Sequence, residues 1–156
     1  MSIKDIKIKE NRLEELRLDN DLKQKDIANE LNISGKNYSD WERGVTDIPL
    51  EKSNELANYY DCSLDYLFGL SNIKTINERK NINLELLSQR LLDTRKERNL
   101  TQSELSKDVG YHQRTYAHYE NGSRIPTSFK VFYIALYYNI SLDYLVGKSD
   151  IKEIAN

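Results

Sequence analysis

The chain has 156 residues, a formal net charge of −2, 38% hydrophobic residues and 31% charged residues, which is typical of a soluble chain of one or two small domains. A single cysteine, Cys62, excludes a disulfide within the chain, and no signal-peptide core or run of about 18 apolar residues is present. These features exclude a disulfide-stabilised secreted scaffold and a membrane-spanning protein, and they favour a cytoplasmic location.

The sequence repeats itself at an offset of 78 residues. The matching pieces are Arg12-Leu13 with Arg90-Leu91, Gln24 with Gln102, Glu42-x-Gly44 with Glu120-x-Gly122, and Ser-Leu-Asp-Tyr-Leu at 63–67 with the same five residues at 141–145. Self-similarity over nearly the whole chain indicates two copies of one structural unit. We therefore expect domains at 8–72 and 84–150, joined by a short polar connector at 73–83.

Apolar residues three and four apart, followed by polar or glycine stops, predict five short helices in each copy. In the first copy we expect helices at 11–20, 24–31, 35–43, 50–60 and 64–68. In the second copy we expect them at 85–98, 102–109, 113–121, 128–138 and 142–146. No alternating pattern of useful length predicts a strand, so the expected fold class is all-α. The connector lacks Gly and Pro, which favours a partly helical spacer over a floppy tether.

The spacing also predicts a small core in each copy. Its expected members are Leu13, Leu16, Ile27, Leu31, Tyr38, Trp41 and Leu56 in the first copy, and Leu91, Leu105, Val109, Tyr116, Tyr119, Ile134 and Leu145 in the second. A domain near 65 residues buries only about 60% of its unfolded surface. Each copy should therefore be marginal alone and gain stability from its neighbour.

The segment 128–138 is apolar nearly all round, and such a helix is usually covered on more than one face. We expect it to pack against the first copy or against a second chain in a homodimer, through Phe132, Tyr133 and Tyr137. The alternative is a wide core stripe with scattered surface tyrosines.

The stretch 101–122 carries the clearest functional pattern. Thr101, followed three residues later by Glu104, predicts a capping box at a helix start. Gly110 breaks the apolar spacing, which resumes until Gly122. Two short helices joined by a tight bend are typical of a DNA-reading helix-turn-helix.

Together with its flanks, this stretch resembles the lambda repressor and Cro-like (XRE) helix-turn-helix family. The matching pieces are Leu100-Thr101-Gln102, Tyr119-Glu120-Asn121-Gly122, Ile125-Pro126 and Ser141-Leu142-Asp143-Tyr144-Leu145. The resemblance implies two tandem five-helix domains. It also implies a sequence-specific transcriptional regulator of bacterial or phage origin, a repressor, that binds double-stranded DNA without a cofactor or metal.

In this family the recognition helix lies in the major groove, and its first residues meet base edges. Glutamine can read adenine and arginine can read guanine, so Gln113 and Arg114 suit these positions; a simply solvated helix face is the alternative. The DNA-binding residues that the resemblance implies in the second copy are Gln102, Gln113, Arg114, Thr115, His118, Asn121 and Arg124.

The first copy departs from this pattern. Gly35 offers no side chain at a reading position, and Asp40 places a negative charge where its twin has His118. Residues 1–78 hold 11 basic and 16 acidic residues, whereas residues 79–156 hold 12 and 9, so the second copy should bind DNA better. The first copy then reads a degenerate half-site or has turned to protein contacts. Its equivalent DNA-binding residues are Gln24, Lys36, Asn37, Asp40 and Arg43.

The resemblance also implies two structural ion pairs, each tying the first helix of a copy to the end of its recognition helix. The pairs are Arg17 with Glu42, and Arg95 with Glu120.

Enzymatic readings lack the required residues. His112 and His118 stand six apart and do not share a helix face, and no acidic or cysteine cluster completes a metal site. The rival to a DNA reader is therefore a helix-turn-helix scaffold that binds protein, such as an antitoxin, an anti-repressor or a phage inhibitor. The acidic first half and the apolar segment 128–138 favour this rival.

Overall fold

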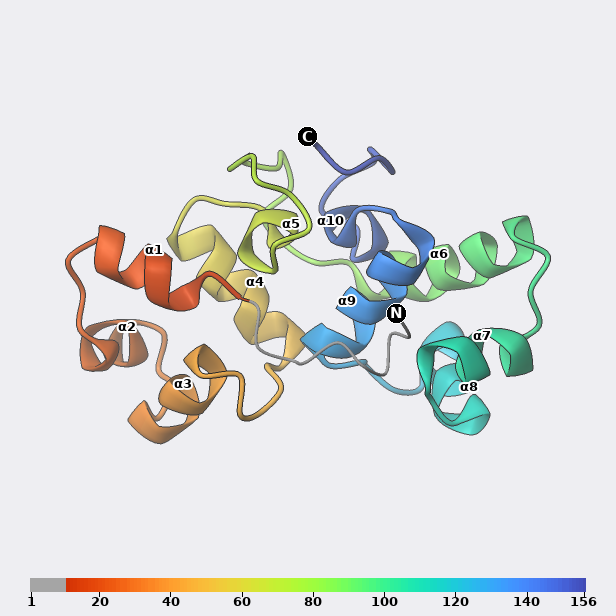
Figure 1. The fold of residues 1–156 in the computed structure, drawn as a ribbon, viewed down its shortest axis with the longest axis horizontal. Helices are drawn as coiled ribbons and strands as arrows, with labels where there is room; N and C mark the ends of the chain where they lie inside the picture. The colour runs from red at the N-terminus through yellow and green to blue at the C-terminus, as the bar shows by residue number, and fades with distance from the viewer. Residues whose placement is uncertain (1–10) are drawn as a thin grey trace.

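The computed structural model describes residues 11–156, which form ten helices and no strand (Figure 1). The helices of the first copy are α1 (Leu13–Asp19), α2 (Gln24–Glu30), α3 (Gly35–Glu42), α4 (Leu50–Tyr59) and α5 (Leu64–Leu67). Those of the second copy are α6 (Leu84–Glu97), α7 (Gln102–Val109), α8 (Gln113–Asn121), α9 (Ser128–Tyr138) and α10 (Leu142–Leu145). The all-α fold class is confirmed, and every predicted helix is present with its ends within two residues of the expected positions.

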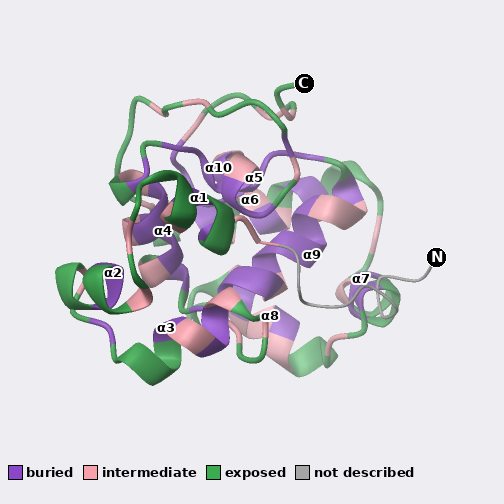
Figure 2. Cartoon of the chain, turned by 60° about the vertical axis from the view of Figure 1, so that its left-hand side comes forward, coloured by how far each residue is buried: buried purple, intermediate pink, exposed green. Residues whose placement is uncertain are grey.

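The predicted core residues are buried, apart from Leu31, which is partly buried and packs against the core. Figure 2 shows that α9 is buried along most of its length, whereas the lower end of α3 is exposed. The connector contains no helix in the structure, so the expectation of a partly helical spacer was wrong.

The two copies lie side by side in a nearly twofold arrangement. Figure 1 shows α5 and α10 together at the centre, with α3 and α8 at the two lower corners. Both α3 and α8 therefore lie on the same side of the molecule.

Two aspartates hold α5 and α10 together at the centre. The N–H of Leu142 and the hydroxyl of Ser141, at the start of α10, donate to Asp65 at 2.6 Å each. The N–H groups of Leu64 and Asp65, at the start of α5, donate to Asp143 at 2.9 and 2.8 Å. Each copy thus supplies the carboxylate that satisfies the unpaired amides at the start of the other copy's helix. We call this pair of contacts the reciprocal cap.

A loop of the first copy also caps α9 of the second. Asp47 accepts hydrogen bonds from the hydroxyl of Thr127 and, at 3.0 Å, from the N–H of Phe129. Three residues separate Gly44 from Ile48, whereas two separate Gly122 from Ile125. The first loop, which has one more residue, thus caps a helix of the other copy, and the second loop does not supply such a cap.

Aromatic rings extend this contact between the copies. The Phe68 ring, just after α5, lies 5.5 Å from the ring of Phe129 and 6.0 Å from that of Phe132, measured between centroids. In contrast, the hydroxyl of Tyr137 donates to Asp108 on α7 at 2.7 Å, within the second copy. Tyr133 is buried beside Phe132, with 5.5 Å between the ring centroids.

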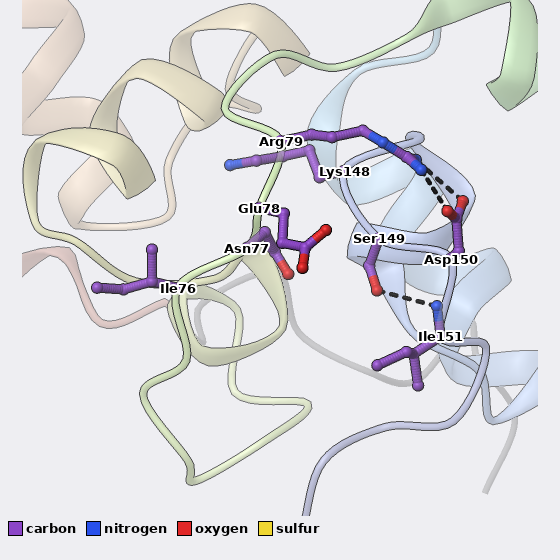
Figure 3. A pocket seen from close by; sticks show the side chains of 8 residues that line it. All are labelled: Ile76, Asn77, Glu78, Arg79, Lys148, Ser149, Asp150 and Ile151. Carbon is purple, nitrogen blue, oxygen red and sulfur yellow. Dashed lines mark hydrogen bonds and ion pairs between the residues drawn. The ribbon is translucent and has the colours of Figure 1, made fainter.

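The connector is hydrogen-bonded to both copies. The side-chain amides of Asn54 and Asn58 on α4 donate to the carbonyl of Lys80 at 3.0 and 2.8 Å. Asn77 donates to Asp143 at 2.7 Å. Figure 3 shows Arg79 reaching Asp150 beyond α10. The residues around this ion pair line a hollow with a volume of 240 Å³ between the connector and the C-terminal segment. The connector therefore helps to fix the relative positions of the copies.

A buried ion pair joins the first and third helices of each copy. Arg17 contacts both carboxylate oxygens of Glu42, at 3.0 and 2.8 Å, and Arg95 contacts those of Glu120, at 2.6 and 3.1 Å. In both pairs the arginine side chain is 13% exposed and the glutamate side chain 4% exposed. Burial opposes ionisation of Glu120, but the hydrogen bonds from Arg95 lower its pKa below the usual value.

Replacing Arg95 with Ala should destabilise the protein by about 3–5 kcal/mol, because the substitution strands a buried carboxylate. The free energy of unfolding from urea titrations measures this effect. A double variant that also carries Glu120→Gln should recover part of the loss, since it no longer buries an unpaired charge. Equal stabilities of the single and double variants would contradict this account.

The reciprocal cap should make stability depend on pH. Burial and the neighbouring Asp143 carboxylate raise the pKa of Asp65 to about 7, above the value of about 3.9 in an unfolded chain. The folded state therefore binds the Asp65 proton more tightly than the unfolded chain does. The stabilisation of the folded state by this protonation is complete below about pH 4 and is lost as the pH rises through about 7.

Between about pH 5 and about pH 8, the free energy of unfolding of the wild type should fall by on the order of 2 kcal/mol relative to that of Asp65→Asn, whose side chain does not titrate. Urea titrations at the two pH values measure this difference. The asparagine oxygen can still accept from the Leu142 N–H, and the amide nitrogen can donate to the Ser141 hydroxyl oxygen. Parallel pH profiles for the two proteins would rule out this titration.

Candidate nucleic-acid interface

Local sequence signals set the start and end of the helices in the second copy's helix-turn-helix. The predicted capping box at α7 is present: the Glu104 N–H donates to the Thr101 hydroxyl at 3.1 Å, and the Thr101 N–H donates to the Glu104 carboxylate at 2.7 Å. Gly110 ends α7 with φ of 80°, and Gly122 ends α8 with φ of 77°. Glycine adopts this left-handed conformation without steric cost.

Buried tyrosines set the orientation of α8. Tyr116 and Tyr119 lie on its inner face, with their rings 6.5 Å apart and nearly perpendicular. Gln113 and Arg114, on the first turn, are exposed, and Thr115 beside them is half-buried. The structure therefore brings these three residues together at the N-terminal end of α8, where members of the family contact base edges.

The other end of α8 is a hydrogen-bonded turn. His118 Nδ1 lies 2.6 Å from the hydroxyl oxygen of Ser123, and Asn121 Oδ1 accepts from the N–H of Ser123 at 2.9 Å. Arg124 is exposed just beyond. Sequence reasoning missed Ser123, because no motif marks it. Its contacts orient His118 and leave the Nε2 atom of the imidazole and the amide nitrogen of Asn121 for further contacts.

Gln102, at the start of α7, is oriented by the buried ion pair. Its amide nitrogen donates to Glu120 at 2.7 Å, and in the first copy Gln24 donates to Glu42 at 3.4 Å. An amide nitrogen carries two hydrogens, so each glutamine retains one donor that could meet a phosphate.

The corresponding surface of the first copy lies at the start of α3. The Ser34 hydroxyl caps α3 by accepting from the N–H of Asn37 at 3.1 Å. Gly35, Lys36 and Asn37 are exposed. A Cβ added at Gly35 would meet no atom within 4 Å, so neither packing nor backbone conformation requires glycine here. The first copy therefore lacks a side chain at a position where one would fit.

Asp40 lies between two cations of its own helix. Its carboxylate accepts from Lys36 at 2.9 Å and from Arg43 at 2.6 Å. The hydrogen bond from Lys36 lowers the pKa of Asp40 below its usual value. Asp40, Lys36 and Arg43 are thus brought together, but Asp40 is buried beneath its partners.

No group of three or more His, Cys, Asp or Glu within residues 11–156 could hold a metal ion. None of the helices in that range is long and apolar enough to cross a membrane.

Comparison with known proteins identifies two curated relatives from Bacillus subtilis (strain 168). The HTH-type transcriptional regulator ImmR is 36% identical over 72 residues, which cover 46% of this chain and 57% of ImmR. The uncharacterized HTH-type transcriptional regulator YobD is 36% identical over 62 residues, which cover 40% of this chain and 55% of YobD. The chain thus spans little more than half the length of either relative. No solved structure matches it.

The helix-turn-helix family model matches the chain twice. The matched residues are 13–67 and 91–145, which include α1–α5 and, from within α6 onward, the helices of the second copy through α10. The two matches begin and end at the same offset of 78 residues that relates the internal repeats. This chain therefore belongs to the helix-turn-helix family of lambda repressor and Cro-like (XRE) regulators and carries its characteristic domain in two tandem copies.

Proposed function

We propose that this protein is a sequence-specific DNA-binding transcriptional regulator, a repressor, in which one chain reads two segments of the same duplex. The observation that carries the proposal is the presence of α3 and α8 on one side of the molecule (Figure 1), held by the reciprocal cap. Half-sites read by such paired helices lie about 34–36 Å apart, one turn of the double helix. Occupying such a site in a promoter would block transcription.

The second copy supplies most of the affinity in this proposal. Gln113 and Arg114 read base edges in the major groove, with Thr115 and His118 beside them. Gln102, Asn121 and Arg124 contact the backbone and fix the register.

The first copy reads the second segment more weakly. Lys36 and Asn37 are its exposed candidates at the start of α3, while Gln24 and Arg43 reach phosphates. Its net charge of −5 over residues 1–78, against +3 over residues 79–156, favours this ranking, because phosphate neutralisation supplies most non-specific affinity. Unequal recognition helices imply an asymmetric operator for each chain.

We further propose that packing between the copies takes the place of a homodimer. The domains extend over 8–72 and 84–150, with 73–83 as connector, and Phe132 contributes to their contact through Phe68. Residues 8–10 lie outside the described part of the chain. A regulator of this kind acts in the cytoplasm, where its DNA is found.

The rival is a helix-turn-helix scaffold that mainly binds protein. One argument for it was the apolar face of α9, but Phe129 and Phe132 pack against Phe68 of the same chain. The acidic first half remains in its favour. Retention on DNA separates the two functions, since a DNA reader loses affinity steeply as salt rises and an apolar protein interface does not.

Selection of bound oligonucleotides from a random pool, followed by footprinting, tests the proposal directly. We expect one enriched asymmetric motif and two protected segments about one helical turn apart for each chain. A pool without enrichment would remove the regulator assignment, and a single protected segment would restrict DNA reading to one copy.

Replacing Arg114 with Ala should weaken binding to the selected duplex by about tenfold or more, because a guanine contact contributes on the order of 1–3 kcal/mol. Lys36→Ala, at the matched position of the first copy, should cost only about threefold if it loses one phosphate contact. Fluorescence anisotropy titrations at fixed salt compare the two variants. The reverse ranking would contradict the assignment of the second copy as the main reader.

A further inference from the structure

The recognition helix of the first copy carries an acid that neutralises its own cations. Asp40 bridges Lys36, four residues before it, and Arg43, three residues after it, at 2.9 and 2.6 Å. The Asp40 side chain is 9% exposed, while those of Lys36 and Arg43 are 85% and 61% exposed. The two cations thus cover the carboxylate and face solvent on the helix that would approach DNA.

The second copy offers an internal comparison. At the offset of 78 residues, the counterparts of Lys36, Asp40 and Arg43 are Arg114, His118 and Asn121. His118 contacts Ser123 in the following turn. This helix therefore has a cation at the reading position and no acid one turn later.

We propose that Asp40 is a specificity-determining residue that restrains the first recognition helix, so that α3 engages the duplex only when α8 has already bound. This inference rests on the proposed function, because it assigns unequal roles to two DNA-reading helices. Asp40 is a restraint on its neighbours and does not itself read bases.

Asp40 weakens DNA binding both while Lys36 and Arg43 are paired with it and after they have left it. While Lys36 and Arg43 remain paired with Asp40, part of their charge is cancelled before a phosphate can be neutralised. Exposed ion pairs are individually weak, so phosphates can draw both cations away. The carboxylate of Asp40 is then left uncovered beside a polyanion, which repels it.

Protonation does not remove the negative charge of Asp40 near neutral pH. The hydrogen bond from Lys36, the charges of Lys36 and Arg43 and the hydrogen bond from Arg43 outweigh burial and lower its pKa. The charge therefore persists during the encounter with DNA, when both cations are still in place.

A different role would give the opposite result. A carboxylate that contacts an arginine can also orient it, and Asp40 lies where it could direct Arg43 toward a guanine. Neutralising Asp40 would then reduce affinity for the selected duplex and weaken discrimination between sequences. The experiment below separates orientation from restraint.

The decisive variant is Asp40→Asn, measured in the full chain on two labelled duplexes of about 30 base pairs, one selected and one of mixed sequence. We expect about fivefold tighter binding to the mixed duplex and about twofold tighter binding to the selected one, since favourable contacts of α3 on a suitable segment already offset part of the repulsion that the variant removes. The slope of log affinity against log salt should steepen by on the order of one, as Lys36 or Arg43 neutralises a further phosphate.

Two further variants serve as matched controls. His118→Asp places an acid at the same position in the second copy and should weaken binding by about fivefold. Asp61→Asn removes the same charge from the exposed turn between α4 and α5, on the opposite side of the first copy from α3 (Figure 1), and should change affinity less than twofold. Thermal unfolding of each variant establishes that α3 remains folded.

Weaker binding of the selected duplex by Asp40→Asn would overturn the proposal in favour of orientation of Arg43. Unchanged binding would also overturn it, because α3 would then not approach the duplex. Neither result would affect DNA reading by α8, which Arg114→Ala tests separately. If the wild type failed to bind either duplex, the proposed function itself would fail.

Discussion

The rest of the structure depends on the reciprocal cap between Asp65 and Asp143. Each aspartate satisfies amide groups at the start of a helix in the other copy, so neither α5 nor α10 has a complete start without its partner. Buried amides without partners are costly, and this cost favours one relative placement of the two copies. The connector adds contacts from Asn77 to Asp143 and from α4 to Lys80. The distance between α3 and α8 is therefore set within a single chain. In a dimer of separate subunits, the paired arrangement would instead be populated only at sufficient protein concentration.

Duplication allowed the two copies to differ where packing does not constrain them. The ion pair from the first helix to the end of the third has the same form in both copies, with matching exposure of its arginine and glutamate. In contrast, the exposed start of the recognition helix carries Gly35 and Lys36 in one copy and Gln113 and Arg114 in the other. Substituting a buried group costs stability, because a partner or packed volume is lost. Substituting an exposed side chain costs little. The scaffold is thus common to both copies, and the reading surface is not.

The sequence predicted what depends on local patterns, and it marked 128–138 as a segment that the first copy or a second chain would cover. It did not predict the hydrogen bonds that join the copies. Helix bounds followed from apolar spacing and from caps such as Thr101 with Glu104, because those signals involve residues three or four positions apart. The Ser-Leu-Asp pieces at 63–65 and 141–143 were recognised as repeats of each other, and periodicity could not reveal that each aspartate caps the other copy. The extra residue before Ile48 was visible in the sequence. Its role depends on the position of α9, because Asp47 accepts two hydrogen bonds at the start of that helix. Asp40 and DNA phosphates compete for Lys36 and Arg43, and sequence spacing alone does not show which partner these cations prefer.

Rigid linkage changes what a weak reading helix can contribute. Once α8 has bound, α3 is already positioned near the same duplex, so its contact is intramolecular and avoids most of the entropic cost of a second association. Even a recognition helix with a missing side chain at Gly35 and partly cancelled charge at Lys36 can then add affinity at a suitable site. At sites with an unsuitable second segment, the proposed restraint would bring Asp40 close to phosphate and reduce affinity. In the proposed function, a strong reader and a restrained one, held at a fixed distance, would therefore discriminate between operators better than two strong readers, which would both bind non-specific DNA through charge alone.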